Sequence, residues 1–330
     1  MRQAKLYRYT LPMDSGVILR DTKLTSREGW VVELIENGKH ALGEIAPLPG
    51  FSQESLQEAG IQAQQYLELW VKEGHLDSDL DECFPSVAFG LSCAVMDLAN
   101  RLPISGNYQA APLCSGDPDD LLPILNTMPG HKVAKIKVGM YEAIRDGMIV
   151  SLFLESIPDL TLRLDANRAW SLEKANKFAS YISPSLRQRI AFIEEPCKTP
   201  GDSLSFAIDT GIAIAWDETL QEAVRASDFS VRSLTGVKTL IMKPTLVGSL
   251  EKCMSLIEAA HQHGIQVVIS SSLESSIGLN HLARFSQWQL PNETPGLDTM
   301  QLFAAQLEVT WPKCRLPVST LDEQTLYWQS

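Results

Sequence analysis

The chain has 330 residues, of which 45% are hydrophobic, so it can bury a sizeable core in two domains or in one large domain with an attachment. Its formal net charge of -12 argues against a nucleic-acid or anionic-membrane surface. The first residues contain no apolar signal segment, and no apolar run approaches the roughly 18 residues of a membrane span. We therefore expect a cytoplasmic protein. The six scattered cysteines lack C-x-x-C spacing and predict reduced thiols, with a disulfide set as the alternative.

Residues 1 to about 105 predict a separate α+β domain. The stretch "VILRDTKLTSREGWVVELIENGKHALGEIAP" alternates like antiparallel strands, and Asn37-Gly38 within it is a hairpin signal. The loop "PLPGFSQES" then leads into a helix, for which Ser55 and Glu58 can form a capping box. A second helix is expected around "PSVAFGLSCAVMDLANRL". These features describe a capping domain placed before a larger domain.

The boundary of this domain is expected within "PISGNYQAAP", so that the larger domain covers residues 106–305. It begins with a strand inside "AAPLCSG", followed by a helix with Asp117 as its N-cap and Pro118 as its first residue. The C-terminal "LEVTWPKCRLP" is strand-like. We expect the final segment, from about residue 306 to residue 330, to join the capping domain.

The larger domain shows a regular alternation of strand and helix. Strands are expected within "KVAKIKVGM", "LTLRLDANRAW", "RIAFIEEPC", "GIAIAWDET", "VKTLIMKPT" and "IQVVISSS". Between them lie helical patterns, such as Tyr141, Ile144, Met148 and Leu152 after the first strand. This alternation recurs at intervals of roughly 25 residues and is typical of a parallel sheet built from βα units. It predicts an α/β fold with a closed (β/α)-type barrel. An open doubly wound sheet is the alternative, but the chain has no G-x-G-x-x-G motif.

Polar residues end each of these six strands. They are Lys137, which shares its strand face with Lys135, then Asp165, Glu194, Asp217, Lys243, and finally Ser270 with Ser271. In barrels of this type the catalytic residues stand at the carboxyl ends of the strands. Taken singly, a carboxylate after a strand is more often a helix N-cap, and a strand-end lysine is usually solvated. The interpretation therefore depends on the whole set and its order.

The three carboxylates are expected to converge at one end of the barrel. Such a group is costly unless a cation compensates it, and all-oxygen ligation suits Mg²⁺, or Mn²⁺ as a substitute, rather than zinc. Asp165, Glu194 and Asp217 are thus the candidate metal ligands. A second cation such as Lys135 beside Lys137 would favour the neutral amine that a general base must be.

The motifs "KIK", "LDANRAW", "IEEP", "AWDE" and "IMKP", in this order, resemble the enolase superfamily, muconate-lactonizing subgroup. The resemblance implies a (β/α)₇β TIM-type barrel with an N-terminal capping domain. It also implies proton removal next to a carboxylate through an enediolate, with lysine acid–base groups and Mg²⁺, a pairing known for this superfamily. It assigns the catalytic roles to Lys137, Lys243 and Lys135, and the metal to Asp165, Glu194 and Asp217.

Substrate contacts are expected from Arg163, Asn167, Ser270 and Ser271, although Arg163 and Asn167 can equally pair with the carboxylates. Glu195 is expected to point away from the site and pair with helix side chains. Loop motifs, among them "MDSGVILRD" and "PLPGFSQ", resemble a water-eliminating lyase of the subgroup and are expected to cover the tail of a small-molecule substrate. No nucleic-acid or membrane partner is expected. The oligomeric state stays open, with a monomer as one possibility.

Several other activities are compatible with the same residues. N-succinylamino acid racemisation and dipeptide epimerisation need the same pair of lysines. A class I aldolase would use one barrel lysine as a Schiff base without metal, and a non-catalytic binding protein would need none of them. Because fold and metal site are shared across the superfamily, only the loop motifs favour dehydration.

Overall fold

The computed structural model describes residues 2–19, 22–76, 80–114, 117–234 and 236–330. The chain forms two compact units. One unit comprises Met1–Ala110, Lys243–Glu258 and Ile269–Ser330, and the other comprises Ala111–Met242 and Ala259–Val268. The expectation of a loop over "MDSGVILRD" is wrong for residues 13–19, which belong to a β-strand that runs from Arg2 to Leu19, and residues 20 and 21 lie outside the described residues.

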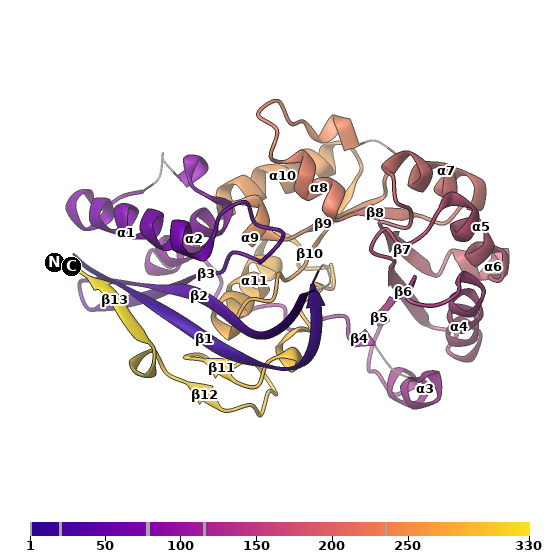
Figure 1. The fold of residues 1–330 in the computed structure, drawn as a ribbon, viewed down its shortest axis with the longest axis horizontal. Helices are drawn as coiled ribbons and strands as arrows, with labels where there is room; N and C mark the ends of the chain where they lie inside the picture. Colours follow the sequence, from indigo (N-terminus) through magenta and orange to yellow (C-terminus); the bar gives the residue numbers. More distant parts are fainter. Residues whose placement is uncertain (1, 20–21, 77–79, 115–116, 235) are drawn as a thin grey trace. The chain divides into compact units, whose positions relative to one another are not determined.

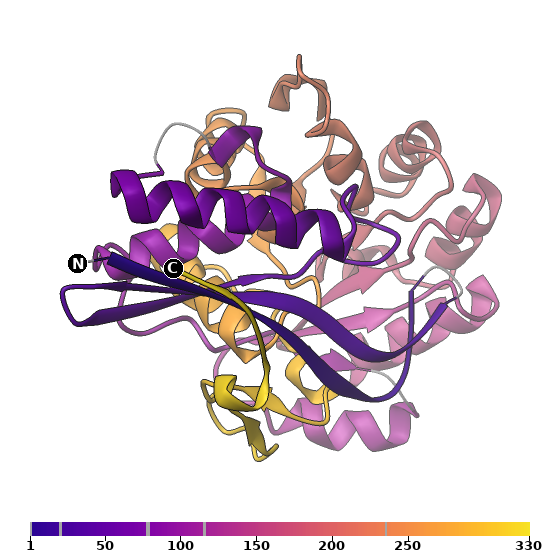
Figure 2. The ribbon, with the colours of Figure 1, turned by 60° about the vertical axis from the view of Figure 1, so that its left-hand side comes forward.

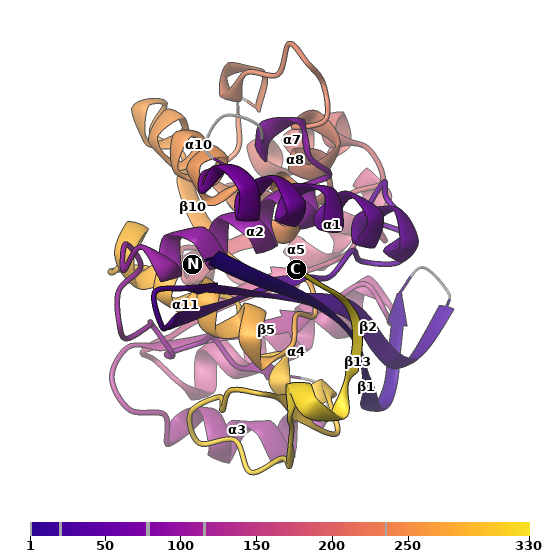
Figure 3. The same cartoon turned by 90° about the vertical axis from the view of Figure 1, so that its left-hand side faces the viewer.

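The first unit contains an antiparallel sheet in the order β13-β1-β2-β3. Its strands are β1 (Arg2–Leu19), β2 (Thr22–Glu36), β3 (Lys39–Ile45) and β13 (Thr325–Gln329). The expected hairpin is confirmed, because Asn37 and Gly38 connect β2 to β3 with φ values of 53° and 78°. β13 pairs with β1, so the end of the chain lies beside its beginning (Figure 3).

Two helices, α1 (Leu56–Glu73) and α2 (Pro85–Leu98), cover one face of this sheet (Figure 2). The predicted capping box at the start of α1 is confirmed: the Ser55 side chain accepts from the Glu58 N–H, and the Glu58 side chain accepts from the Ser55 N–H. Apolar side chains of the sheet and of both helices form one core, in which Trp30 packs with α1. The amphipathic pattern of these elements therefore accounts for their packing.

The remaining elements of the first unit are short apart from one helix. They are α9 (Pro244–Val247), α11 (Ser276–Gln289), β11 (Gln306–Leu307) and β12 (Val318–Ser319). The expectation of a strand over "LEVTWPKCRLP" is largely wrong, since only its first residue belongs to β11. The return to the capping sheet is made by β13 instead.

The second unit is built around a parallel sheet in the order β10-β9-β8-β7-β6-β5-β4, which follows the chain (Figure 1). The strands are β4 (Leu113–Cys114), β5 (Lys132–Lys137), β6 (Leu160–Asp165), β7 (Ile190–Glu194), β8 (Ile214–Trp216), β9 (Thr239–Met242) and β10 (Gln266–Ile269). The helices that follow β4 to β9 are α3 (Pro118–Asn126), α4 (Ala143–Ser156), α5 (Leu172–Ser180), α6 (Pro184–Arg187), α7 (Pro200–Thr210), α8 (Glu218–Ala223) and α10 (Leu250–Gln262). The first part of α10, up to Glu258, belongs to the first unit. All seven predicted strands are confirmed.

Short 3₁₀ helices complete the chain. They are η1 (Leu80–Glu82), η2 (Val231–Leu234), η3 (Met300–Leu302) and η4 (Leu321–Glu323). Beyond β10, a single parallel bridge joins Ser270 to Gly296 in the position of an eighth strand. The predicted N-cap of α3 is confirmed, because the Asp117 side chain accepts from the Asp119 N–H.

The buried face of α4 differs from the sequence pattern. Tyr141, Met148 and Leu152, which have helical spacing, are exposed. The helix instead buries Val150, Phe153 and other residues that include Gly147, where an added Cβ would lie 2.6 Å from a backbone oxygen of α5. The buried face is therefore a second apolar stripe at helical spacing, which includes Val150, Phe153 and Leu154 and contains the close backbone approach at Gly147.

All six cysteines are free thiols, as the sequence predicted. Among the described residues, none of the helices combines the length and the apolar character needed to cross a bilayer.

Candidate active site

Three acidic residues lie at neighbouring strand ends in the second unit. Asp165 ends β6, Glu194 ends β7, and Asp217 directly follows β8. Asp165 is paired in register with Glu194, and Glu194 with Ala215, so that Asp217 lies two residues beyond on the same face. The three residues are only 6%, 2% and 3% exposed, respectively. The three acids therefore follow one another at the carboxyl ends of neighbouring strands.

An apolar layer lies below the carboxylates along the same strands. Phe192, Ala215, Ile241 and Val268 form a buried cluster, and Phe192 is two residues before Glu194 on the same face of β7. This layer keeps water from one side of the acidic group. The carboxylates are consequently held in surroundings that penalise uncompensated negative charge.

Lys135 bridges two of the three acids. Its Nζ lies 3.0 Å from Asp165 Oδ2 and 2.7 Å from Glu194 Oε2. Burial alone would lower the pKa of Lys135, but the charges of Asp165 and Glu194 outweigh it and raise that pKa above its usual value. Lys135 is therefore a charged group at neutral pH. This contact with the carboxylates was not foreseen from the sequence.

Glu194 has a raised pKa although its side chain contacts the charged Lys135. Burial raises the pKa of Glu194, and the negative charges of Asp165 and Asp217 raise it further, while Lys135 opposes them only in part. Lys135 thus bridges two of the three carboxylates, and the pKa of Glu194 still lies above its usual value. The donors are oxygens, which fit a hard divalent cation in chemical type and in charge.

The side chains of Asp165, Glu194 and Asp217, as positioned here, do not form a complete metal site. Within the described ranges, no group of three or more His, Cys, Asp or Glu residues has the spacing needed to hold a metal ion. Asp217 instead accepts a hydrogen bond of 2.6 Å from Gln221 Nε2. Gln221 was missed in the sequence analysis, although its place four residues after Asp217 on α8 is the signal that could have found it.

Lys137 is the last residue of β5 and is exposed, and it is paired in register with Asp165. The loop after Lys137 is held by Asp146 of α4, whose Oδ2 accepts from the Gly139 N–H at 2.7 Å. Gly139 has φ of +84°, and an added Cβ would lie 2.7 Å from Ala169 Cβ. The chain leaving Lys137 is thus fixed against the loop that follows Asp165.

The other expected contacts in this unit lie on either side of Asp165. Arg163 is buried on the same face of β6, with its guanidinium carbon 5.5 Å from the centre of the Phe192 ring. Asn167 is exposed and has φ of +46°, and its backbone N–H donates to Asp165 Oδ1 at 3.1 Å. The backbone of Asn167 therefore orients Asp165.

Lys243, Ser270 and Ser271 belong to the first unit. Lys243 follows the last residue of β9 and immediately precedes α9. The Ser270 hydroxyl donates to the Gly296 carbonyl at 3.2 Å, and the Ser271 and Thr299 hydroxyls lie 2.8 Å apart. Both serines are buried and keep acceptor capacity for a ligand.

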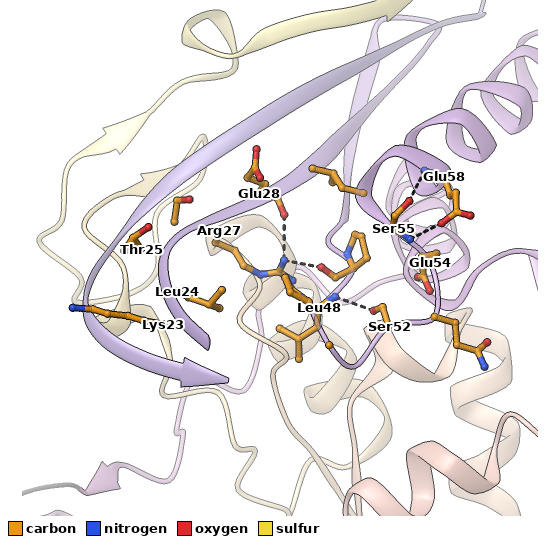
Figure 4. Close-up of a pocket in the computed structure, with 16 residues that line it drawn as sticks. Lys23, Leu24, Thr25, Arg27, Glu28, Leu48, Ser52, Glu54, Ser55 and Glu58 are labelled. Carbon is orange, nitrogen blue, oxygen red and sulfur yellow. Dashed lines mark hydrogen bonds between the residues drawn. The ribbon is translucent and has the colours of Figure 1, made fainter. Parts of the chain in front are cut away.

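The first unit also contains a pocket of about 560 Å³ between β2 and the loop before α1 (Figure 4). Leu48 and Ser52 of the "PLPGFSQ" loop line it, opposite Leu24 and Thr25 of β2. Arg27, which is buried and also lines the pocket, donates hydrogen bonds to the carbonyls of Ala46 and Pro47 and so holds this loop against β2. The role of this loop in covering a substrate stays a prediction.

Comparisons with known proteins agree with this architecture. The chain matches the family models described as "MenC, N-terminal domain" over residues 1–98 and "Enolase C-terminal domain-like" over residues 126–313. A protein of Vibrio cholerae named o-succinylbenzoate synthase is 66% identical over 100% of this chain and 99% of its own length. One of the same name from Aliivibrio salmonicida is 57% identical over 100% of both.

Solved structures share the fold. An o-succinylbenzoate synthase of Thermosynechococcus elongatus, complexed with magnesium in its active site, has a TM-score of 0.73 at 24% identity, covering 89% of this chain and 92% of its own. MenC from Desulfotalea psychrophila has a TM-score of 0.71 at 22% identity, covering 94% of this chain and 97% of its own. The enolase-type fold, a curled parallel sheet with helices and an N-terminal strand-rich domain, and the resemblance to the enolase superfamily are thereby confirmed. With a relative 66% identical over the whole chain, this protein belongs to the o-succinylbenzoate synthase family of the enolase superfamily.

Proposed function

We propose that the chain is an o-succinylbenzoate synthase, a hydro-lyase that removes water from 2-succinyl-6-hydroxy-2,4-cyclohexadiene-1-carboxylate to form o-succinylbenzoate in menaquinone biosynthesis. The observation that carries this proposal is the 66% identity to a protein of that name over the whole chain. The loop motifs, which had favoured dehydration over racemisation, support the same choice. A cytoplasmic location stays a prediction, and the oligomeric state stays open.

The reaction removes a proton next to the substrate carboxylate and a hydroxyl group from the neighbouring carbon. Lys137, exposed at the end of β5, is the proposed base that takes the α-proton on its Nζ. The C–O bond then breaks, and the same ammonium returns the proton to the departing hydroxyl as water leaves. Base and acid are one residue, so the elimination occurs on one face of the ring.

Lys135 and Lys243 are proposed to act by charge. Lys135 stays protonated between Asp165 and Glu194, where it holds the two carboxylates at a fixed spacing. Lys243 is proposed to stabilise the planar anionic intermediate through its charge and a cation–π contact. Arg163, Asn167, Ser270 and Ser271 are the proposed substrate contacts.

The superfamily uses a divalent cation, and Asp165, Glu194 and Asp217 are the residues that would hold it. Mg²⁺ is our specific proposal, with Mn²⁺ as a substitute, because the donors are carboxylate oxygens. When bound, the cation supplies positive charge that lowers the pKa of the carbon acid.

The test is an ultraviolet assay for the aromatic product, made with the purified chain and the cyclohexadiene substrate. We expect product with Mg²⁺ and none with EDTA. Lys137→Ala should reduce turnover by several orders of magnitude, since it removes both proton transfers. Lys132→Ala is the matched control, because Lys132 starts the same strand and pairs with Asp159 at 2.9 Å; it should leave turnover unchanged.

Two results would overturn this proposal. Full turnover of Lys137→Ala would remove Lys137 as the base. If the wild-type chain forms no aromatic product but exchanges the α-proton of an N-succinylamino acid with deuterated water, the chain is a racemase of the same superfamily.

A further inference from the structure

Glu195 lies directly after the proposed ligand Glu194, one residue past the end of β7. Its side chain is only 1% exposed, and its φ of +42° lies in the left-handed region. This backbone conformation is unfavourable for a residue with a side chain and persists only where the surrounding contacts fix it. Specific contacts must therefore hold the Glu195 side chain in this buried position.

The two oxygens of Glu195 accept four hydrogen bonds, from the loop after β6 and from the start of α8. Oε1 accepts from the backbone N–H groups of Asp217 at 3.0 Å and Thr219 at 2.8 Å. Oε2 accepts from Arg168 Nε at 3.1 Å and from the Thr219 hydroxyl at 3.0 Å. Because a carboxylate offers about four acceptor positions, all of them are used within the protein.

These contacts join the three chain segments that carry the acidic residues. Arg168 belongs to the loop after Asp165, Glu195 follows Glu194, and the N–H of Asp217 itself is held. The backbone adds to this arrangement, because the Arg168 N–H donates to the Glu195 carbonyl at 2.8 Å and the Glu195 N–H donates to the Ala215 carbonyl at 3.1 Å. The buried Glu195 carboxylate is thus hydrogen-bonded to residues that follow β6 and β8, the strands on either side of β7.

We infer that Glu195 is a positioning residue that sets the spacing of Asp165, Glu194 and Asp217 for binding a divalent cation. The inference deepens the proposed function and rests on it. Loss of the carboxylate would free the backbone of Asp217 and the Arg168 loop while leaving all three proposed ligands in the chain. The expected consequence is weaker metal binding.

The experiment measures binding of Mn²⁺ alone to the full-length chain, by the electron paramagnetic resonance signal of free Mn²⁺. Glu195→Gln presents an amide N–H₂ to groups that are themselves donors, so we expect Mn²⁺ affinity to fall by about tenfold, as for other partners of metal ligands. Thr219→Val removes the two hydroxyl contacts, with Glu195 and with Arg168, but keeps the backbone N–H bond to Glu195, so it should reduce affinity by a smaller factor. Thermal unfolding without metal is measured for each variant, so that affinities are compared between folded proteins.

Glu222→Gln is the matched control. Glu222 bonds the outer side of Arg168 at 2.8 Å, and its side chain is 58% exposed. Its loss leaves every contact of Glu195 in place, so Mn²⁺ affinity should stay within about twofold of wild type; exposed pairs of this kind contribute little.

The outcomes separate this inference from the proposed function. If wild type binds Mn²⁺ and Glu195→Gln binds it equally well, with only its thermal midpoint lowered, Glu195 is purely structural and the inference is wrong. If Glu195→Gln does not fold, wild-type affinity in Thr219→Val overturns it, and a selective loss of affinity in Thr219→Val supports it. Absence of Mn²⁺ binding by the wild-type chain would overturn the proposed metal site and this inference with it.

Discussion

Lys135 links two buried acids through one ammonium group, at 3.0 Å from Asp165 and 2.7 Å from Glu194. The charges of these acids raise its pKa, so it cannot readily give up its proton and is unsuited to be a base. Lys137, two residues further along the strand, is left as the proposed base. Two lysines on one strand face are therefore assigned different tasks.

Replacement of Lys135 by methionine should destabilise the metal-free chain. Lys135→Met leaves Asp165 and Glu194 buried without their shared cation, and removing one partner of a buried ion pair costs on the order of 3 kcal/mol. Urea denaturation at neutral pH measures the loss, and Mg²⁺ should recover much of it. Lys132→Met, at the start of the same strand, is the control and should have little effect. Equal behaviour of the two variants, with and without Mg²⁺, would contradict the interpretation of Lys135.

At the scale of elements, β3 and α2 pack backbone against backbone. A Cβ added to Gly43 would lie 2.0 Å from the Gly90 carbonyl oxygen, which no side-chain movement can relieve. Such close packing lets the helix lie directly on the sheet of the first unit.

Gly43→Ala should consequently destabilise the chain by about 3 kcal/mol or more, the upper range for overpacking. Gly201→Ala is the matched control, since an added Cβ there meets nothing within 4 Å. Chemical denaturation followed by circular dichroism compares the two. A midpoint for Gly43→Ala that matches that of Gly201→Ala would show that β3 and α2 are further apart than described.

A second contact between elements joins α2 to α11 through Asp97. Burial opposes its charge, but His281 and Arg284 outweigh this and hold the pKa of Asp97 below its usual range. Arg284 Nη2 lies 2.5 Å from Asp97 Oδ1, and His281 Nε2 lies 4.0 Å from Oδ2. A carboxyl group with a depressed pKa stabilises the fold above its ordinary pKa and loses this effect as the pH falls.

Asp97→Asn should therefore be less stable than wild type at pH 7, and the difference should shrink as the pH falls below about 4, the ordinary pKa of an aspartate. Urea denaturation across this pH range measures both proteins. A difference that stays constant with pH would show that Asp97 acts through packing rather than charge.

At the scale of the whole molecule, the sequence predicted the seven parallel strands and the acidic residues that end them. The prediction of these strands succeeded because each apolar run is followed by a polar residue at the strand end of every βα unit. The contacts of Lys135 and the backbone hydrogen bonds of Glu195 were not predicted, since cross-strand register and loop conformation are set by residues distant in the chain. The pairing of Glu195 with a helix side chain was expected and is present in its contact with Thr219 of α8. The contact of Gln221 with Asp217 was missed although its spacing along the chain is local. The predicted buried face of α4 was wrong because a second apolar stripe with helical spacing, Val150, Phe153 and Leu154, lies on the side where Gly147 permits the close approach of α5.

The proposed function requires that three carboxylates, each at the end of a different strand, bind the same cation. Crystals of the chain soaked in Mn²⁺ and measured at the manganese absorption edge test this most directly. We predict one strong anomalous difference peak coordinated jointly by Asp165, Glu194 and Asp217. A map without such a peak, or with manganese bound only elsewhere, would contradict the account.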